Sequence, residues 1–523
     1  MFNELLKCIS EFIGEFKNGL VDCESDTYIN LKKNYKIIYD NRETNKLYNY
    51  IDAQFKDDAQ LYSLIYSIIW EVARDDEIIK RLYTWLIDVD MDIYSKIALN
   101  FQLIAEAFSN NSKSYVYEEK RRLYDELLEQ YKKKLKIDIE KIPVSDRNPK
   151  KIVIITNQLL NSRHAPTDVV YRIAALLKRD YSFDIQVLCM QTVVSNDILG
   201  LWYNITIPYG QDMEGNTVND EYGVQIPIYF LPVKDTNEEY IKILFQTIYN
   251  MKPAMCWYIG GESIVGDFIG QMTTTISMPC AAGYAISNAD YMINCSDIMT
   301  DDIIKQKQYL VSKNQKPLYL KPVRNLTEGY TGSLKRNDIG AEEEDFLIIV
   351  AGNRLEFEIT EEVISTLKTL VANNKRNKIV FVGKIPVEVQ ENLIEQLHNQ
   401  CVMLGYRDDL LDVIGICNLM FNPPRLGGGS VVLMACGLGI PVISLNEGDA
   451  VVILGTEMCF NTMEELIEDT LKCIDDHEYC MSQREKVIEL YNNFTKTDLS
   501  DYVKEMLQEV ERCENQKILD WEI

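Results

Sequence analysis

A chain of 523 residues is longer than one hydrophobic core usually supports, so we expect roughly two to four domains. Its 46% apolar and 26% charged residues are typical of a globular protein and argue against a disordered one. A formal net charge of −26 argues against a nucleic-acid-binding protein, which needs a basic face to displace counterions. An acidic chain can still contain a local basic pocket for a nucleotide.

The start of the chain lacks the features of an export signal. Segment 1–18 has apolar residues at helical spacing, interrupted by Glu4, Glu11 and Glu15, and so predicts an amphipathic helix. No later segment approaches the roughly 18 uncharged apolar residues of a membrane span. The 13 cysteines are scattered without a CxxC pair, and there are only 3 histidines. We therefore expect a cytoplasmic protein with reduced thiols, no metal site and no transmembrane segment.

Residues 1–145 predict a helical accessory domain. The segment 115–139 is typical, because Leu123, Leu127 and Tyr131 recur at helical spacing among charged residues. The many tyrosines and tryptophans of this region are interpreted as core packing, with a recognition surface as the alternative. The polar segment 143–151 predicts a linker.

From residue 146 the pattern changes to strands alternating with helices, which predicts a doubly wound α/β domain ending near residue 325. The first strand, 151–156, is a β-branched apolar run suited to burial on both faces of a parallel sheet. Further strands are predicted at 184–190, 226–231, 254–260 and 291–295, with helices at 169–180 and near 238–250.

A second α/β domain is predicted at 326–498, followed by a C-terminal helix at 499–523. Its predicted strands are 346–352, 378–384, 401–405, 419–424 and 441–445, and its helices are 361–374, 388–399, 409–416 and 430–438. Two tandem Rossmann-like domains place a cleft at the carboxyl ends of both sheets, where ligands of such sheets bind. Dehydrogenases and binding proteins share this arrangement, so the fold alone does not define the chemistry.

The segment 422–445 contains a glycine run between a strand and a helix. Gly427, Gly428 and Gly429 have no Cβ, so a ligand can approach the backbone closely. Ser430 is predicted as the N-cap of the next helix, whose first N–H groups would bind an anion such as a diphosphate. The alternative is a glycine turn that only packs the helix on its sheet. The run matches neither the Walker motif nor GxGxxG.

The wider segment resembles the donor-site signature of the GT-B glycosyltransferases. The spacing is closest to that of the O-GlcNAc-transferase and HMW1C-like protein glucosyltransferases, and family-4 retaining enzymes have a looser form of it. The residues that match are Gly428, Gly429, Ser430, Ala435, Gly439, Pro441 and Val442. The resemblance covers about 151–500 and implies the GT-B fold, with two Rossmann-like domains and a cleft between them.

The resemblance assigns further donor-binding residues. Tyr406 and Arg407 lie in a G-[YF]-x-[DE]-D-L-like segment whose loop reaches the base of the donor, and Arg354 matches a basic residue that contacts the diphosphate. Lys384 is a candidate for the second charge there, although it also reads as an ordinary exposed lysine. Glu447 and Asp449 are candidates for binding hydroxyls of the donor sugar.

Two positions depart from the family pattern. Met434 stands where related enzymes have a carboxylate, and a thioether is a poor substitute as a hydrogen-bond acceptor. The second basic residue expected a few positions after Arg354 is absent, and Glu356 and Glu358 stand nearby instead. These departures favour the alternative of a non-catalytic GT-B paralogue, whereas the intact GGGS run and Arg354 count against it.

His164 and Glu262 are the candidate catalytic residues on the acceptor side. His164 precedes a predicted helix with Thr167 or Asp168 as its cap, and a neutral imidazole there could take a proton from an acceptor hydroxyl. Glu262 follows two glycines after an apolar strand and could act as a base or bind sugar hydroxyls. The alternatives are a locally hydrogen-bonded loop histidine and a glutamate in a first helical turn that favours the helix dipole.

The resemblance implies a metal-independent glycosyltransferase that needs no cofactor besides its nucleotide-sugar donor, with UDP as the expected nucleotide. The helical domain resembles the appended domains of protein-modifying GT-B enzymes, which suggests protein glycosylation of an acceptor such as a surface adhesin or flagellin. The helical domain could also mediate oligomerisation or binding of a partner subunit. The alternatives are a non-catalytic acceptor-binding or partner subunit of a glycosyltransferase complex, and a nucleotide-sugar epimerase or phosphorylase on the same fold.

Overall fold

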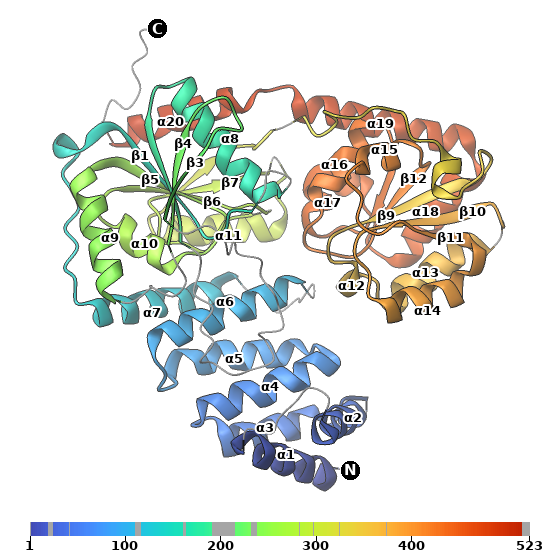
Figure 1. The fold of residues 1–523 in the computed structure, drawn as a ribbon, viewed down its shortest axis with the longest axis horizontal. Helices are drawn as coiled ribbons and strands as arrows, with labels where there is room; N and C mark the ends of the chain where they lie inside the picture. The colour runs from blue at the N-terminus through green and yellow to red at the C-terminus, as the bar shows by residue number, and fades with distance from the viewer. Residues whose placement is uncertain are drawn as a thin grey trace. The chain divides into compact units, whose positions relative to one another are not determined.

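The computed structural model describes residues 2–18, 25–40, 42–109, 117–160, 164–190, 215–231, 238–281, 283–296, 298–323, 325–372 and 374–514 (Figure 1). Contacts divide the chain into two compact units. The first unit comprises Met1–Phe108, Ser112–Ser277 and Ile286–Asp290; the second comprises Ser109–Asn111, Met278–Ala285 and Tyr291–Ile523.

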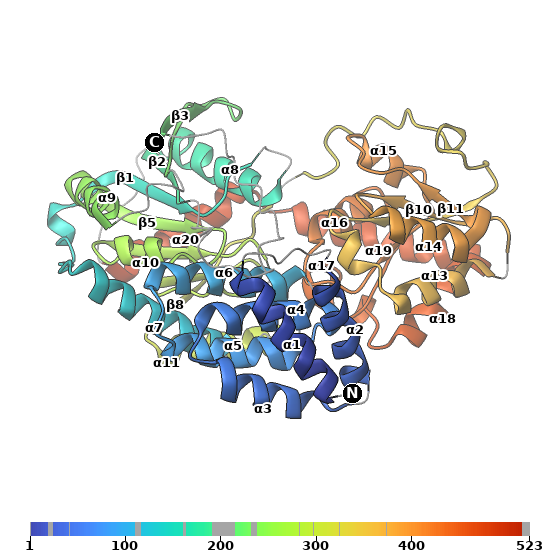
Figure 2. The same cartoon turned by 60° about the horizontal axis from the view of Figure 1, so that its bottom comes forward.

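The first unit begins with the predicted helical region (Figure 2). Its helices are α1 (Phe2–Lys17), α2 (Asp26–Asp40), α3 (Thr44–Phe55), α4 (Ala59–Ala73), α5 (Asp76–Asp88), α6 (Ile93–Ser109) and α7 (Tyr117–Leu135). Aspartates begin two of them, because Asp58 accepts from Leu61 N at 3.1 Å and Asp75 accepts from Glu77 N at 3.0 Å.

Most of the described tyrosines of this region belong to its core, as interpreted from the sequence. Tyr62 and Tyr66 are buried, and both hydroxyls donate to Asp52 at 2.7 Å. Arg81 forms an ion pair with the same carboxylate. A buried phenol that donates its hydroxyl loses little on burial, so this network stabilises the packing of α3, α4 and α5.

The first sheet has eight strands in the order β3-β4-β2-β1-β5-β6-β7-β8. The strands are β1 (Asn148–Thr156), β2 (Asp184–Cys189), β3 (Gly215–Asn219), β4 (Ile226–Phe230), β5 (Pro253–Ile259), β6 (Thr274–Met278), β7 (Tyr291–Asn294) and β8 (Lys316–Tyr319). β1 pairs in parallel with β2 and with β5, whereas β3 pairs antiparallel with β4. The associated helices are α8 (Ala165–Arg179), α9 (Glu238–Met251), α10 (Ile264–Gly270) and α11 (Asp301–Ser312).

Within the first unit, α7 packs against α10. The ring of Tyr131 meets that of Phe268 edge-on, with 5.4 Å between centroids. Tyr124 donates its hydroxyl to Asp267 Oδ2 at 2.6 Å, and Ser287 donates to the other oxygen at 2.7 Å. The helical region is therefore attached to this part of the α/β unit by aromatic packing and by a buried hydrogen-bonded carboxylate.

The second sheet has five strands, all parallel in their described pairings, in the order β11-β10-β9-β12-β13. They are β9 (Phe346–Ala351), β10 (Asn377–Val382), β11 (Cys401–Met403), β12 (Leu419–Asn422) and β13 (Val442–Ser444). The helices around it are α12 (Leu355–Glu358), α13 (Glu361–Ala372), α14 (Val387–Leu397), α15 (Leu410–Gly415), α16 (Gly429–Gly437), α17 (Gly448–Leu454), α18 (Met463–Asp475) and α19 (His477–Thr495). The last helix, α20 (Leu499–Glu514), contacts β8 instead.

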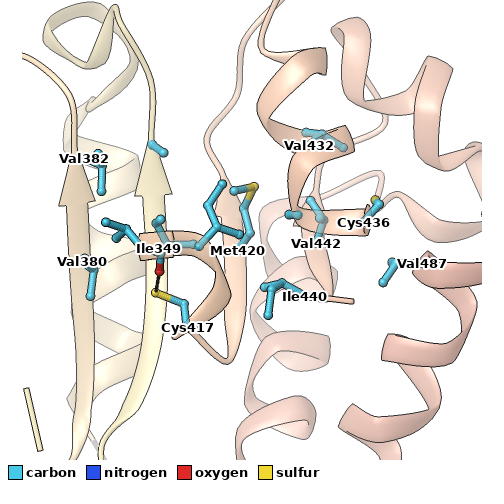
Figure 3. Packing of buried hydrophobic residues seen from close by; sticks show 14 of the residues in the cluster. Ile349, Val380, Val382, Cys417, Met420, Val432, Cys436, Ile440, Val442 and Val487 are labelled. Carbon is cyan, nitrogen blue, oxygen red and sulfur yellow. Dashed lines mark hydrogen bonds between the residues drawn. The ribbon is translucent and has the colours of Figure 1, made fainter. Parts of the chain in front are cut away.

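Both faces of this sheet are buried, as successive residues of β9 show. Leu347 and Ile349 pack into one core with α15, α16 and α17, part of which is drawn in Figure 3. Ile348 and Val350 pack into a second core with α13, α14 and α18. This alternation explains why the strand is apolar throughout, as predicted for a parallel sheet.

The sequence patterns do not predict several of the observed strands, and they misplace the ends of some other elements. The short strands β3, β6 and β8 were not expected, and β1 begins at Asn148, inside the predicted linker. Helix α20 ends at Glu514, and the rest of the predicted C-terminal helix, 515–523, lies outside the described residues. The domain boundaries at 145, 325 and 498 stay predictions. None of the described helices is long and apolar enough to span a membrane.

Candidate functional site

The candidate donor site lies at the carboxyl edge of the five-stranded sheet. In the order β11-β10-β9-β12-β13 the direction of winding changes between β9 and β12, and ligands of open α/β sheets bind at such switch points. The predicted donor residues all follow these five strands, either in the loops after them or at the start of α16: Arg354, Lys384, Tyr406, Arg407, Gly427, Gly428, Gly429, Ser430 and Glu447.

Three of these loops approach one another to backbone contact. Gly352 N donates to Val382 O at 3.0 Å, and Gly383 N donates to Gly405 O at 2.8 Å. A Cβ on Gly383, whose φ is +144°, would lie 1.9 Å from the carbonyl oxygen of Gly352. Only glycine fits there, so the loops after β9, β10 and β11 form one closely packed surface.

The glycine run turns the chain from β12 into α16. Gly428 is the N-cap residue, with φ of +93°, and Gly429 is the first helical residue. The prediction that Ser430 caps this helix is wrong, because the left-handed turn at Gly428 begins the helix two residues earlier than a serine cap would. Val432 N donates to Gly428 O at 3.3 Å, so the first turn of α16 begins directly after the run.

The loop after β13 packs against the same run. Asp449 N donates to Leu426 O at 2.9 Å, and a Cβ on Gly448 would lie 2.1 Å from Arg425 O. Glu447 is half-buried at the N-cap position of α17. The predicted donor residues Glu447 and Gly427 to Ser430 therefore belong to one continuous surface within the second unit.

Arg425 is a site residue that the sequence analysis missed. It is buried, and its Nε donates to Asn422 Oδ1 at 2.8 Å. Its Nη1 donates to Ala351 O and to Glu358 Oε2, both at 3.0 Å. Burial lowers the pKa of Arg425, and the facing Glu358 opposes that shift. No pattern in the sequence pairs two residues this far apart, so only the fold reveals their contact.

The predicted basic residues have different partners. Arg354 is half-buried at the N-cap position of α12, with its Nε 3.8 Å from Glu358 Oε1. Lys384 is exposed, and no ion pair of its ammonium with another described residue is found. Arg407 donates to both oxygens of Asp409, at 2.7 and 2.6 Å, and this pairing lowers the pKa of Asp409. Arg354 and Lys384 are therefore better placed than Arg407 to meet an anion.

Tyr406 and Met434 differ in exposure. Tyr406 is 65% exposed in the loop after β11, so its ring is accessible for stacking. Met434 is partly buried and packs against the apolar core formed by β9, α15 and α16. A carboxylate there would have to leave this contact to reach a ligand.

His164 occupies the N-cap position of α8 without capping it through its side chain. The helix begins at Ala165, so the prediction that Thr167 or Asp168 caps it is wrong. His164 Nδ1 is 2.9 Å from Thr167 Oγ1, and Leu160 N donates to that hydroxyl at 2.9 Å. Burial lowers the pKa of His164, which keeps the imidazole neutral at pH 7. Residues 161–163 of this loop lie outside the described residues.

Glu262 lies between β5 and α10. The N-cap of α10 is Ser263, whose Oγ accepts from Gly266 N at 3.0 Å, so the alternative that Glu262 lies in the first helical turn is wrong. The half-buried carboxylate interacts with Lys120 of α7 and forms a hydrogen bond with Asn100 of α6. Its side chain is thus engaged by the helical region of the same unit.

Burial is the largest cause of the pKa shifts of Glu262 and Lys120. It raises the pKa of Glu262 to about 7, while Lys120 and Asn100 act to lower it. It lowers the pKa of Lys120 to about 8, while Glu262 acts to raise it. Burial therefore favours the neutral form of both groups, and the attraction between their charges opposes it. Within the part of the chain that the structure describes, no group of three or more His, Cys, Asp or Glu side chains could hold a metal ion.

Comparison with known proteins gives a structural match only. No family model and no curated protein sequence matches the chain. Among solved structures, a variant of Thermobaculum terrenum O-GlcNAc transferase is similar with a TM-score of 0.54 and 12% identity, covering 98% of this chain and 97% of that one.

Two further structures have TM-scores of 0.49 and cover less of this chain. Anabaena Alr3699/HepE in complex with UDP is 12% identical and covers 69% of this chain and 100% of its own. Sucrose-phosphate synthase from Thermosynechococcus elongatus is 12% identical and covers 70% and 100%. The chain has the GT-B fold, and the resemblance inferred from its sequence is confirmed for the fold.

Proposed function

We propose that the chain is a glycosyltransferase that binds a nucleotide sugar, with UDP as the nucleotide, at the carboxyl edge of the five-stranded sheet. The observation that supports this most is the position of the glycine run. Gly427 to Gly429 follow β12 and the Arg354 loop follows β9, so the two loops flank the switch point of the sheet. Ligands bind there in open α/β sheets, and the α16 N-terminus favours a phosphate.

The described residues suggest how the donor would be held. Arg354 and Lys384 would neutralise the diphosphate, and the first N–H groups of α16 would donate hydrogen bonds to it. Tyr406 would stack on the base, and Glu447 would accept from hydroxyls of the donor sugar. These contacts would also stabilise the negative charge that develops on the leaving nucleotide, which is the main requirement of the transfer step.

On the acceptor side, His164 is the proposed base. A neutral imidazole that uses Nδ1 for Thr167 can take a proton through Nε2 from an acceptor hydroxyl as the new glycosidic bond forms. Glu262 is the second candidate, because its pKa of about 7 allows it to accept a proton near neutral pH. We further propose a protein as the acceptor and a cytoplasmic location for the reaction.

Two observations favour a second candidate function, that of a GT-B subunit that binds a nucleotide or an acceptor without transferring sugar. Glu358 lies near the position where a basic residue is expected. It forms an ion pair of 3.0 Å with Arg425. Met434 packs into the apolar core in place of a carboxylate. Either change could remove transfer and leave binding intact.

Release of free UDP from UDP-glucose and UDP-N-acetylglucosamine, followed by chromatography, tests the proposal. A transferase is expected to hydrolyse one donor slowly without acceptor. The His164→Ala variant should then lose acceptor-dependent turnover by roughly 10²-fold or more. His477→Ala, which changes an exposed histidine, should match the wild type. Tight UDP binding without any UDP release would support the non-catalytic alternative.

A further inference from the structure

A cavity lies between the carboxyl ends of β7 and β8 and the helix α11, within the second compact unit. These elements are found among the yellow-green ribbons of Figures 1 and 2. Its volume is about 290 Å³, close to the lower end of the roughly 300–1,000 Å³ usual for small-molecule sites. The residues that line it are Tyr284, Asn294, Ser296, Met299, Lys307, Pro317, Leu318 and Tyr319.

The floor of the cavity is fixed by hydrogen bonds in the turn after β7. Asn294 and Ser296 are buried, and Ser296 N donates to Asn294 Oδ1 at 3.2 Å while Asn294 Nδ2 donates to Ser296 O at 3.0 Å. Ser296 Oγ donates to Ile298 O at 3.0 Å. Asn294 Oδ1 accepts one hydrogen bond, from Ser296 N, and Ser296 Oγ accepts one from Ile298 N at 2.9 Å. Each oxygen therefore has one lone pair left that can accept from a ligand hydroxyl.

Aromatic rings form part of the walls. Tyr284 is buried, and its backbone N donates to Gln306 Oε1 at 3.0 Å. Burial raises the pKa of Tyr284 to about 12, so its hydroxyl remains a donor at neutral pH. Tyr319 is held by Tyr502 of α20, with ring centroids 5.5 Å apart and planes at 78°. Fixed aromatic faces beside fixed oxygens suit the apolar face and the hydroxyl edge of a sugar ring.

Lys307 adds a positive charge to this cavity. It projects from α11, is exposed, and makes no ion pair with any other residue in the described part of the chain. Lys305 on the same helix differs, because its ammonium lies 3.6 Å from Asp302 Oδ1. In a chain of formal charge −26, a lysine without a carboxylate partner at a cavity favours an anionic ligand.

We propose that this cavity, the β7–β8 pocket, binds a monosaccharide that carries one anionic group, such as a phosphate or a carboxylate. The volume limits the ligand to about one ring, the tyrosines and the oxygens of Asn294 and Ser296 bind the ring, and Lys307 binds the anion. None of these residues belongs to the loops of the candidate donor site, so the inference does not depend on the proposed function.

Calorimetric titration of the full chain with glucose 6-phosphate and with glucuronate tests the pocket. Glucose and inorganic phosphate serve as fragment controls, and each should bind more weakly than the anionic sugars. Lys307→Gln should weaken binding of the anionic sugars roughly tenfold, because one charge-assisted hydrogen bond is lost. Tyr284→Phe should weaken it by a smaller factor. Lys305→Gln is the matched control and should leave binding unchanged.

Two results would overturn the proposal. One is the absence of heat with either anionic sugar for folded wild-type protein. The other is equal weakening by Lys305→Gln and Lys307→Gln, or equal affinity for inorganic phosphate and glucose 6-phosphate, which would indicate a nonspecific anion effect. Titrating UDP into the same preparations separates this inference from the proposed function. Loss of sugar binding with UDP binding intact contradicts only the pocket, and the reverse contradicts only the donor site.

Discussion

At the scale of single residues, Arg425 connects three segments at the carboxyl edge of the second sheet. Its guanidinium binds the end of β9 through Ala351 O, the end of β12 through Asn422, and α12 through Glu358. Because the ion pair is buried, removing one partner leaves an uncompensated charge, whereas removing both does not. The arginine is therefore expected to position the glycine run rather than to contact a ligand.

Arg425→Met is expected to lower the free energy of unfolding by about 3 kcal/mol, because the buried Glu358 would lose its 3.0 Å ion pair and keep only the longer contact with Arg354. The double variant Arg425→Met/Glu358→Leu should recover most of that loss. Chemical denaturation measures both. A double variant as unstable as the sum of the two single variants would contradict the idea that the penalty comes from the unpaired charge.

Gly428 is expected to tolerate no side chain, for two separable reasons. Its φ of +93° strains any other residue, and an added Cβ would lie 2.4 Å from Arg425 Nε. Gly340→Ala is the matched control, since Gly340 has φ of +77° with nothing within 4 Å of an added Cβ.

Gly340→Ala should lower the free energy of unfolding by roughly 1–2 kcal/mol through backbone strain. Gly428→Ala should lower the free energy of unfolding by about 1–3 kcal/mol more than Gly340→Ala does. The hydrogen bonds of the Arg425 side chain prevent it from moving away from the added methyl group. Thermal or urea unfolding compares the two variants. If both variants lose the same free energy of unfolding, the Arg425 side chain moves away from the new methyl group and the expected clash is absent.

At the scale of elements, the contact of α7 with the loop between β5 and α10 depends on pH. The pKa of Glu262 is raised to about 7, so its contribution to stability is present at low pH and is lost as the pH rises from about 4.5 to 7. The pKa of Lys120 is lowered to about 8, so its contribution is present above about 10.5 and is lost as the pH falls toward 8.

Lys120→Met should therefore destabilise the protein at pH 8, because the half-buried, ionised Glu262 loses the attraction of the nearby ammonium. At pH 5 the loss should be much smaller, since Glu262 can take up a proton. The double variant Lys120→Met/Glu262→Gln should be insensitive to pH across this range. Urea denaturation at both pH values measures this, and a loss in Lys120→Met that is equal at pH 5 and pH 8 would refute the coupling.

The elements that the sequence predicted well are those whose burial dictates their composition. Strand β9 is apolar throughout because both of its faces are covered, and its bounds follow from that run. Strand β3, GNTVN, has no such pattern, because it is defined by antiparallel pairing with β4. The cap of α16 was misassigned because a serine is a common cap, and the sequence does not show that Gly428 adopts a left-handed conformation.

At the scale of the whole molecule, two Rossmann-like sheets and a helical region follow from the order of patterns along the chain. The donor-edge loops could be predicted because each directly follows a strand, and the carboxyl ends of parallel strands share one edge. The Arg425–Glu358 pair, the Lys120–Glu262 pair and the β7–β8 pocket could not be predicted. Each unites residues that are distant in sequence, and no local periodicity encodes such contacts.

Calorimetric titration of the purified protein with UDP, GDP and ADP tests the central claim most directly. We predict micromolar binding of UDP, its loss in Gly428→Asp, and roughly tenfold weakening in Arg354→Ala through loss of one charge-assisted contact. Arg376→Ala, which changes an exposed arginine just before β10 at the opposite edge of the sheet, should bind UDP as the wild type does. If no nucleotide binds to well-folded wild-type protein, the claim that this edge is a nucleotide-sugar site is wrong.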